Sequence, residues 1–385
     1  MPATPVLDAS LLETIRSRAA AHDRDASFPH DDLADLAATG YLRSFVPTDM
    51  GGLGLSLVEV SREQRRLAGA SPATALVVNM HLVVTGLAAV MLARGDSAAR
   101  FILEEAAQGE IFAFGNSEAG NDLVMFDSRT RAERHEDGSY HFTGKKTFTS
   151  GSPAWTRLAV FGKDESDPAA PVLVHAVLAR DASGISVASD WDTLGMRATQ
   201  SCTTVLSGAR AEPHRVYRTL PPGPSADLFI FALFAVFEIL LAAVYAGIGA
   251  RALDLAVEAA HRRTSMKNGG RSYAQDPDIR WRVADAAIVQ DGLDPQIDAL
   301  ARDVDDLVDH GGLWFAKVVA LKVRATETAR DVVDKAIRVA GGSSFYNGSE
   351  LGRLYRDVLA GIFHPSDDES AHATVARAWL GPLAP

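Results

Sequence analysis

The spacing of apolar residues changes twice along the chain. In residues 1–110, apolar side chains such as Leu11, Leu12 and Ile15 recur every three or four positions, and this period predicts amphipathic helices. In residues 111–220, apolar and polar side chains alternate in short runs, and a period of two predicts β-strands. A helical N-terminal domain is therefore expected to precede a compact β domain.

The helical period returns after a proline-rich linker at residues 221–224 and continues through residues 225–385. Four stretches in this part are long enough to form a four-helix bundle. The expected helices are residues 228–263, 278–292, 296–310 and 313–340. Together these patterns predict a multidomain α+β protein with an N-terminal helical domain, a central small β-barrel or sandwich and a C-terminal four-helix bundle.

Composition narrows the classes of function. The 385 residues carry a formal net charge of -11, which argues against nucleic-acid binding because that requires a basic face. Cys202 is the single cysteine, so no disulfide can form within the chain, and we expect a protein of the reducing cytoplasm. Residues 228–250 are long and apolar enough to span a membrane, but Glu238 interrupts them. We therefore expect a buried helix and no membrane association.

Residues 144–155 have the character of a binding surface for a flat ring. They read Gly-Lys-Lys-Thr-Phe-Thr-Ser-Gly-Ser-Pro-Ala-Trp and lie between two predicted strands. Phe148 supplies an apolar surface beside the hydroxyl groups of Thr149 and Ser150. Hydroxyl and backbone donors beside an aromatic ring are what a bound isoalloxazine would require.

The order of the α, β and α parts, together with several short segments, resembles the acyl-CoA dehydrogenase superfamily over nearly the whole chain. No segment is specific alone, but their joint order is. The segments are residues 28–40 and 46–54 in the first part, 114–122, 144–150 and 194–201 in the second, and 340–342 and 353–357 in the third. The resemblance implies FAD bound between the β domain and the bundle, in a homotetramer or homodimer.

The resemblance also implies positions for residues around the flavin ring. Phe148 would pack against the isoalloxazine, while Thr149 and Ser150 would hydrogen-bond its polar edge near N5. Ser117 and Glu118 would offer backbone N–H donors to the pyrimidine side of the ring.

Further from the ring, the resemblance implies contacts to the phosphates and to the substrate. Arg263 would neutralise an FAD phosphate. Gly341 and Gly342 would lie near the FAD of a neighbouring subunit, where glycine lets the backbone approach a pyrophosphate. The substrate cavity is expected to involve Met80, His81, Trp155 and Phe345.

The catalytic base departs from the family pattern. Counted from Arg356 and Asp357, the usual position of the base is Pro365, which cannot accept a proton. A minority of the family carries the base on the first long bundle helix, where Glu238 lies one residue from the expected position among apolar neighbours. Burial raises the pKa of a carboxylate, which suits a base. We favour an FAD-dependent acyl-CoA dehydrogenase that uses Glu238 and an electron-transfer flavoprotein.

A second function stays open from the sequence. The superfamily also contains monooxygenases that receive reduced flavin, FAD or FMN, from a separate reductase and hydroxylate aromatic or other small substrates through a C4a-hydroperoxide. Those that can be compared often have Ser-Gly where Ser150 and Gly151 stand and a histidine where His364 stands. Ser150 could stabilise the hydroperoxide, and His364 could deprotonate a phenol or indole. A third alternative is a non-catalytic scaffold that has lost its base.

Overall fold

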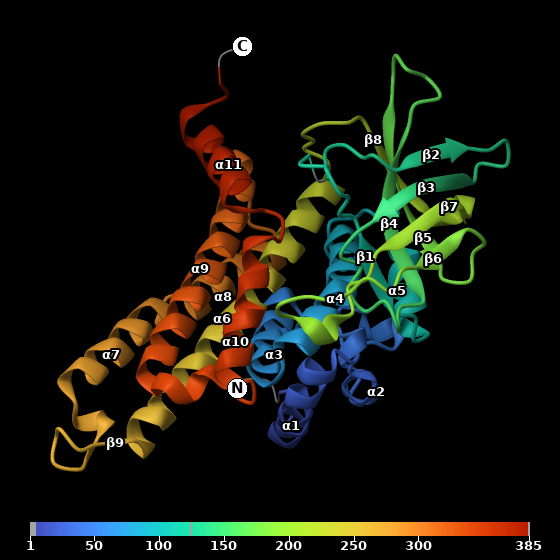
Figure 1. Ribbon diagram of the computed structural model, residues 1–385. Coiled ribbons are helices and arrows are strands. Elements are labelled where there is room, and N and C mark those ends of the chain that lie inside the picture. Colours follow the sequence, from blue (N-terminus) through green and yellow to red (C-terminus); the bar gives the residue numbers. More distant parts are fainter. Residues whose placement is uncertain (1–4, 124, 384–385) are drawn as a thin grey trace.

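Helices make up one side of the molecule, and a β-sheet packs against the other (Figure 1). The computed structural model describes residues 5–123 and 125–383. Residues 1–4, 124, 384 and 385, which belong to the three predicted domains, lie outside the described residues.

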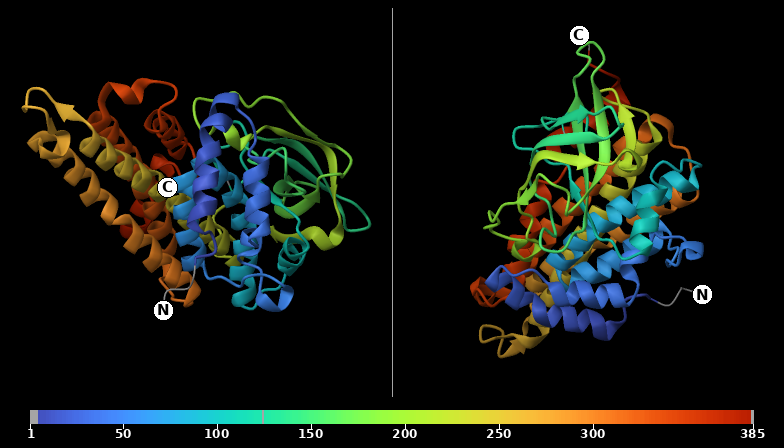
Figure 2. Two further views of the ribbon diagram at one scale, coloured as in Figure 1. Left: turned by 90° about the horizontal axis from the view of Figure 1, so that it is seen from below. Right: turned by 90° about the vertical axis from the view of Figure 1, so that its right-hand side faces the viewer.

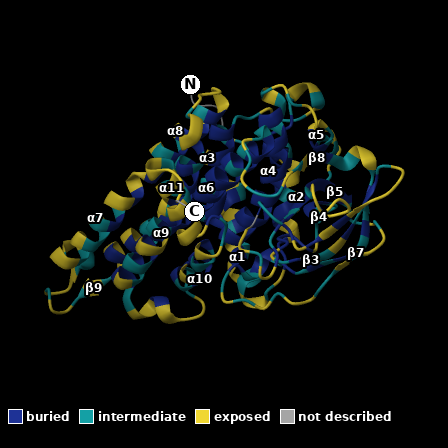
Figure 3. Ribbon diagram, turned by 90° about the horizontal axis from the view of Figure 1, so that it is seen from above, coloured by how far each residue is buried: buried dark blue, intermediate teal, exposed yellow. Residues whose placement is uncertain are grey.

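The N-terminal part is helical, as its apolar spacing predicts. Its α-helices are α1 (Ala9–Asp25), α2 (His30–Ala38), α3 (Leu57–Ala70), α4 (Pro72–Ala93) and α5 (Arg100–Ala107). The N-terminus of α3 is closed by a capping box, because Ser56 Oγ accepts from the N–H of Glu59 and the Glu59 carboxylate accepts from the N–H of Ser56. Helix α4 is apolar on all sides and contacts both the sheet and the C-terminal helices, so it is buried along most of its length (Figure 3).

The four helices expected in the C-terminal part are observed, with ends that differ by a few residues. They are α6 (Leu228–Arg262), α7 (Pro277–Asp291), α8 (Leu293–Asp305) and α9 (Trp314–Ala340). Two shorter helices, α10 (Glu350–Val358) and α11 (Asp368–Leu380), also pack against α9. The domain therefore contains more than the predicted four-helix bundle.

Helices α4 and α6 are both long and apolar enough to cross a membrane. In each, more than four-fifths of the most apolar stretch is buried inside the protein, at 89% and 83%. Helix α6 packs against α3, α4 and α9, which accounts for its apolar surface on every side. The expectation that residues 228–250 form a core helix is confirmed.

The central part forms one eight-stranded sheet with the order β6-β7-β3-β2-β4-β5-β8, and β1 also pairs with β4. The strands are β1 (Phe112–Gly115), β2 (Arg131–Arg134), β3 (Tyr140–Lys146), β4 (Arg157–Asp164), β5 (Val172–Ala179), β6 (Ile185–Val187), β7 (Thr204–Ala211) and β8 (Val216–Leu220). Alternate residues of β4 face two different cores: Ala159 and Phe161 join the core of the helices, and Leu158 and Val160 join a second core within the β domain. No pairing joins β6 to β8 among the described residues, so the sheet does not close on itself as a barrel, which was one of the two predicted arrangements.

Candidate active site

A cavity of about 2090 Å³ lies where the β domain meets the helices. One side, here called the β wall, is formed by residues from the segments 114–123, 125–127, 147–150 and 191–201. The other, the helical wall, is formed by residues 233–238 of α6, 312–319 and 356–378. The two layers that supply the walls are seen from two directions in Figure 2. Ligand pockets commonly hold about 300–1,000 Å³, so this cavity has room for a cofactor and a substrate together.

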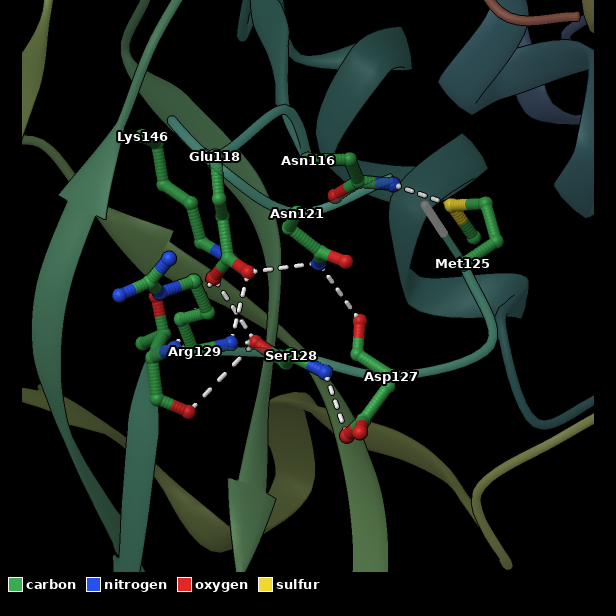
Figure 4. Close-up of polar contacts among 9 residues, drawn as sticks. Asn116, Glu118, Asn121, Met125, Asp127, Ser128, Arg129 and Lys146 are labelled. Atoms are coloured by element: carbon green, nitrogen blue, oxygen red, sulfur yellow. Dashed lines mark hydrogen bonds and ion pairs between the residues drawn. The ribbon is translucent and has the colours of Figure 1, made fainter. Parts of the chain in front are cut away.

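A buried carboxylate organises the β wall (Figure 4). Lys146 Nζ donates to Glu118 Oε1 over 2.7 Å, and both side chains are almost completely buried. The remaining donors to the carboxylate are Thr130 Oγ1, Ser128 Oγ, the N–H groups of Arg129 and Thr130, and Asn121 Nδ2. Burial alone would raise the pKa of Glu118, but the Lys146 charge and these hydrogen bonds outweigh it and lower the pKa to about 2. Glu118 therefore holds the loop after β1 in place as a charged structural group.

Backbone donors and an aromatic ring are presented by the same wall. The N–H groups of Ser117 and Glu118 make no hydrogen bond within the described residues, and both residues line the cavity. Phe148 has a φ of 56° and is 60% exposed at the cavity surface. A left-handed conformation is uncommon for a bulky residue and is typical of functional sites. The strained backbone at Phe148 places an apolar ring at the cavity surface close to these donors.

Ser150 lines the cavity at the start of a chain of hydroxyl groups. Ser150 Oγ lies 2.8 Å from Ser201 Oγ, which lies 2.7 Å from Thr199 Oγ1. Thr199 Oγ1 donates its hydrogen to the carbonyl oxygen of Met196 over 2.8 Å. Because each hydroxyl has one hydrogen, Ser201 then donates to Thr199, and Ser150 donates to Ser201. Ser150 therefore presents acceptor lone pairs to the cavity.

Glu238 lines the helical wall and is completely buried. Its Oε1 accepts hydrogen bonds from the N–H and Oγ–H of Ser366, over 3.1 and 3.0 Å. Its Oε2 has no hydrogen-bond partner within the described residues. Burial raises the pKa of Glu238, and the nearby Lys322 charge and the Ser366 hydrogen bonds only partly offset this. The carboxyl group is therefore uncharged near neutral pH.

His364 lines the same wall, beside the ring of Tyr245. Its Nε2 is buried and lacks a partner within the described residues. Burial and the Lys322 charge lower the pKa of His364 to about 3. The imidazole is therefore neutral at physiological pH and has an unused nitrogen.

A short loop of the β domain is fixed to the helical side. The Asp357 carboxylate accepts from the N–H of Met196 over 2.6 Å, and Arg356 donates to the carbonyl oxygen of Leu194 over 2.9 Å. A Cβ atom at Gly195 would lie only 2.1 Å from the carbonyl oxygen of Arg356, so this contact requires glycine. These contacts join the two walls.

Several residues expected at the site lie elsewhere. His81 is buried and links two segments of the chain. Its Nε2 donates to the carbonyl oxygen of Leu42, and its Nδ1 accepts from the N–H of Phe112. Burial lowers the pKa of His81 to about 4. Trp155 belongs to the inner core of the β domain. Phe345 is 93% exposed on the turn after α9. None of the three lines the cavity, whereas Met80 does, as predicted.

Four further residues, expected near the ring edge or the phosphates, also do not line the cavity. They are Thr149, Arg263, Gly341 and Gly342. The side chain of Thr149 is fully buried behind the wall, so its predicted contact from the hydroxyl group to a ring is not supported. Arg263 donates to the carbonyl oxygens of Val339 and Ala340 and thereby closes the end of α9. Gly341 and Gly342 follow at the same end. These residues lie at the far end of α6 from Glu238, away from the cavity.

Sequence reasoning missed Lys322, Ser366 and Ser201. Lys322 Nζ donates to the carbonyl oxygens of Gly361, His364 and Ser366, over 3.0, 2.8 and 2.7 Å. A lysine among the apolar positions of α9, between Val319 and Ala325, was a visible signal of a buried cation. Ser366 and Ser201 carried no signal, because both act through contacts between segments distant in sequence.

This chain is similar to known proteins over most of its length. Models of the acyl-CoA dehydrogenase N-terminal domain and the acyl-CoA dehydrogenase C-terminal domain match residues 8–116 and 239–369. L-evernosamine nitrososynthase of a Micromonospora species is 30% identical over 92% of this chain and 84% of its own. Dibenzothiophene monooxygenase of Rhodococcus erythropolis is 26% identical over 92% and 88%. The crystal structure of KijD3 with FMN and a dTDP-amino sugar has a TM-score of 0.83 at 27% identity, covering 99% of this chain and 95% of that one.

The three-part fold and the cavity between the β domain and the helices agree with these matches in defining an acyl-CoA dehydrogenase-like flavoenzyme fold. The chain belongs to the acyl-CoA dehydrogenase superfamily.

Proposed function

We propose that this protein is a flavin-dependent monooxygenase that receives reduced flavin from a separate reductase and oxidises an apolar, aromatic small molecule. The observation that carries the proposal is the chemistry of the helical wall. Pro365 stands where the superfamily usually has its base, and Glu238 is buried, tied to Ser366 and uncharged. Dehydrogenation of an acyl thioester requires a carboxylate that takes a proton, whereas the wall offers the neutral imidazole of His364.

The β wall fits a flavin ring. The N–H groups of Ser117 and Glu118, which have no partner in the part of the chain that the structure describes, suit the carbonyl oxygens of a pyrimidine, and Phe148 offers an apolar face. Ser150, with its lone pairs directed to the cavity, suits a ring N–H. Reduced flavin bound here would supply the electrons that activate dioxygen. Both FAD and FMN are compatible with this donor set, and FMN is present in the KijD3 structure.

The cavity favours an apolar substrate. The helical wall is lined mainly by apolar side chains, and a large uncharged molecule would be desolvated there at little cost. The apolar lining residues of this wall include Leu233, Phe234, Phe237, Phe315, Val319 and Phe363. Dibenzothiophene, named in one of the relatives, is such a molecule, whereas the amino sugars named in others are polar.

The residues of the chain have separable tasks in this proposal. His364 would accept a hydrogen bond or a proton only from a substrate that carries an N–H or O–H group, such as indole, because its ring is neutral but weakly basic. Ser150 accepts a hydrogen bond from the cofactor and holds its reactive edge in place. The apolar side chains exclude water from the reacting groups.

The proposal is tested by asking which electron donor the purified protein accepts. Protein supplied with FMN, NADH and a flavin reductase is expected to consume dibenzothiophene or indole with dioxygen, and not with oxidised flavin alone. The same protein loaded with FAD is expected to keep its oxidised absorbance when mixed anaerobically with butyryl-CoA or octanoyl-CoA. Bleaching of the FAD by either thioester would instead establish the dehydrogenase.

A further inference from the structure

The loop of residues 196–202 supports the part of the β wall that carries Phe148 and Ser150. The ring of Trp191, just before this loop, lies edge-on to the ring of Phe148 with the ring centres 6.1 Å apart. Three backbone hydrogen bonds run from residues 149–152 to the loop, and they join the N–H groups of Thr149, Gly151 and Ser152 to the carbonyl oxygens of Cys202, Thr199 and Gln200, over 3.3, 2.9 and 3.2 Å. The positions of Phe148 and Ser150 at the cavity therefore depend on the shape of this loop.

The loop has a backbone shape that is costly to hold. Met196 and Gln200, which flank a short 3-10 helix at Arg197–Thr199, have φ angles of 51° and 45°. Both angles are left-handed, a conformation that is uncommon for residues with a side chain and persists where surrounding contacts enforce it. Contacts from outside the loop must therefore hold it.

A buried carboxylate on α10 supplies such a contact. Asp357 is 2% exposed, and its Oδ1 accepts from the N–H of Met196 over 2.6 Å. A hydrogen bond to a charged acceptor is short and about twice as strong as a neutral one. We propose that Asp357 is a positioning residue, which holds Phe148 and Ser150 in place for a flavin through the loop of residues 196–202. This inference rests on the proposed function for the identity of the cofactor, but the coupling between Asp357 and the β wall belongs to the protein alone.

Met196 connects this carboxylate to the hydroxyl groups of the β wall. Its N–H binds Asp357, and its carbonyl oxygen accepts from Thr199 Oγ1 over 2.8 Å. Thr199 Oγ1 contacts Ser201 Oγ, which contacts Ser150 Oγ, over 2.7 and 2.8 Å. A series of hydrogen bonds therefore runs from α10 on the helical side, through Met196, to Ser150 at the cavity.

The charge of Asp357 is sensitive to pH. Burial raises the pKa of Asp357 to about 6, and the Met196 N–H only partly offsets this. No ion pair joins Asp357 to a cation among the described residues. The charged and titratable groups that face it are Asp23 on α1, Arg197 in the loop, Tyr245 on α6, and Arg353 and Arg356 on α10. Below a pH of about 6 the carboxyl group gains a proton, loses its charge and holds the loop less firmly.

The coupling is tested by hydrogen exchange and mass spectrometry on the full-length protein without flavin. Asp357→Asn keeps the size of the side chain but removes its charge, so at pH 7.5 protection of residues 147–153 and 191–202 is expected to fall about tenfold. Asp164→Asn is the matched control, because Asp164 is also buried and accepts from a backbone N–H, that of Ser166, but does not line the cavity. Unchanged protection in Asp357→Asn, or an equal fall in Asp164→Asn, would overturn the proposal.

The pH profile of the wild type gives a second measurement, which does not depend on the folding of a variant. Protection of residues 147–153, corrected for the intrinsic pH dependence of exchange, should fall about tenfold between pH 7.5 and pH 5 as Asp357 gains its proton. Asp357→Asn should show no such step. A flat profile in the wild type, or a step that remains in Asp357→Asn, would contradict the role of this carboxylate.

Binding of riboflavin tests whether the coupling reaches the cofactor. Riboflavin carries the isoalloxazine ring without a phosphate group, which would itself titrate at a pH of about 6. Asp357→Asn is expected to bind riboflavin about fivefold more weakly than the wild type at pH 7.5 and equally at pH 5. Equal affinities at pH 7.5 would show that Asp357 does not position the wall for a flavin. A wild type that binds no riboflavin would count against the proposed flavin function, while the exchange measurements would still decide whether Asp357 holds the wall.

Discussion

Each wall of the cavity contains a buried glutamate with a buried lysine behind it, but the two lysines have different roles. On the β wall, Glu118 receives six hydrogen bonds and pairs directly with Lys146. On the helical wall, Glu238 receives two, both on one oxygen, and Lys322 binds backbone carbonyls instead. Both side chains are buried, but Glu118 has a direct counter-ion and several donors that keep it charged, whereas Glu238 is more deeply desolvated and has neither among the described residues.

The two glutamates show how a buried group that supports the structure differs from one that retains an unpaired polar atom. A carboxylate with all its lone pairs used can only hold a loop in place, as Glu118 does for the loop after β1. A group with an unpaired buried atom, such as Glu238 Oε2 or His364 Nε2 among the described residues, has hydrogen-bonding capacity that the framework does not use. Buried polar atoms without partners are costly in proteins, and among the described residues two of them, Glu238 Oε2 and His364 Nε2, belong to residues that line the helical wall.

The largest effect is expected from breaking the β-wall ion pair. Lys146→Met leaves Glu118 buried without its counter-ion, and such a change costs about 3–5 kcal/mol of stability. The midpoint of urea unfolding should fall accordingly. The double variant Lys146→Met/Glu118→Gln should recover part of the loss, since it removes both charges. Equal losses of stability in the single and double variants would show that lost packing, and not the unpaired charge, destabilises the protein.

The sequence allowed the three-part fold and most helix boundaries to be predicted, because apolar periodicity and capping residues such as Ser56 are local signals. It also identified Glu238, since a charge inside an apolar helix is visible without a structure. It could not predict that His81 and Trp155 are structural. Their roles depend on which strands and loops pack against them.

The dependence on contacts between distant segments also explains why the sequence could not identify the catalytic base. The choice between a carboxylate and a neutral acid at Glu238 depends on Ser366 and Lys322, which are 128 and 84 positions away. Only the fold brings these two residues close to Glu238. The expected dehydrogenase with Glu238 as its base is therefore replaced in our proposal by the alternative that relies on His364 and Ser150.

His364 provides the next test, now on the helical wall. His364→Ala should lower turnover of indole by about 10²-fold, the lower end of the contribution of a general base, because a base with so low a pKa is weak. It should leave the urea midpoint nearly unchanged. His364→Gln is the matched control, because it keeps a polar side chain that cannot accept a proton at this position. Because the pKa of His364 is lowered to about 3, wild-type turnover should show no histidine titration between pH 5 and 8. An inflection there that vanishes in His364→Ala would contradict the neutral assignment.

The two glutamates should also have opposite effects on stability as pH changes. The folded pKa of Glu118, about 2, lies below its ordinary value of 4.5, so the unfolded state binds more protons between these values. Stability should fall by about 3 kcal/mol as pH drops through that range. Glu238 has a raised pKa, so its contribution is present below pH 4.5 and is lost as pH rises toward its folded pKa.

Urea midpoints measured from pH 3 to pH 9 separate the two contributions. Glu118→Gln should flatten the acid limb of the profile and leave the alkaline limb. Glu238→Gln should do the reverse and should cost less than about 1 kcal/mol at neutral pH, because it replaces a neutral group by another. If Glu238→Gln instead flattens the acid limb, Glu238 is a carboxylate and the contrast between the walls is wrong.

The smallest effect is expected from the hydroxyl chain behind Ser150. Ser201→Ala removes the acceptor that fixes the direction of the Ser150 hydroxyl, so Ser150 can turn its hydrogen toward the cavity. The loss of one neutral hydrogen bond is worth about 1 kcal/mol, which corresponds to a fall in kcat/KM of about fivefold. In a Ser150→Ala background the same substitution should have no further effect, because the hydroxyl it orients is gone. Additive losses in the double variant would show that Ser201 acts independently of Ser150, and that the β wall contributes more than a fixed framework.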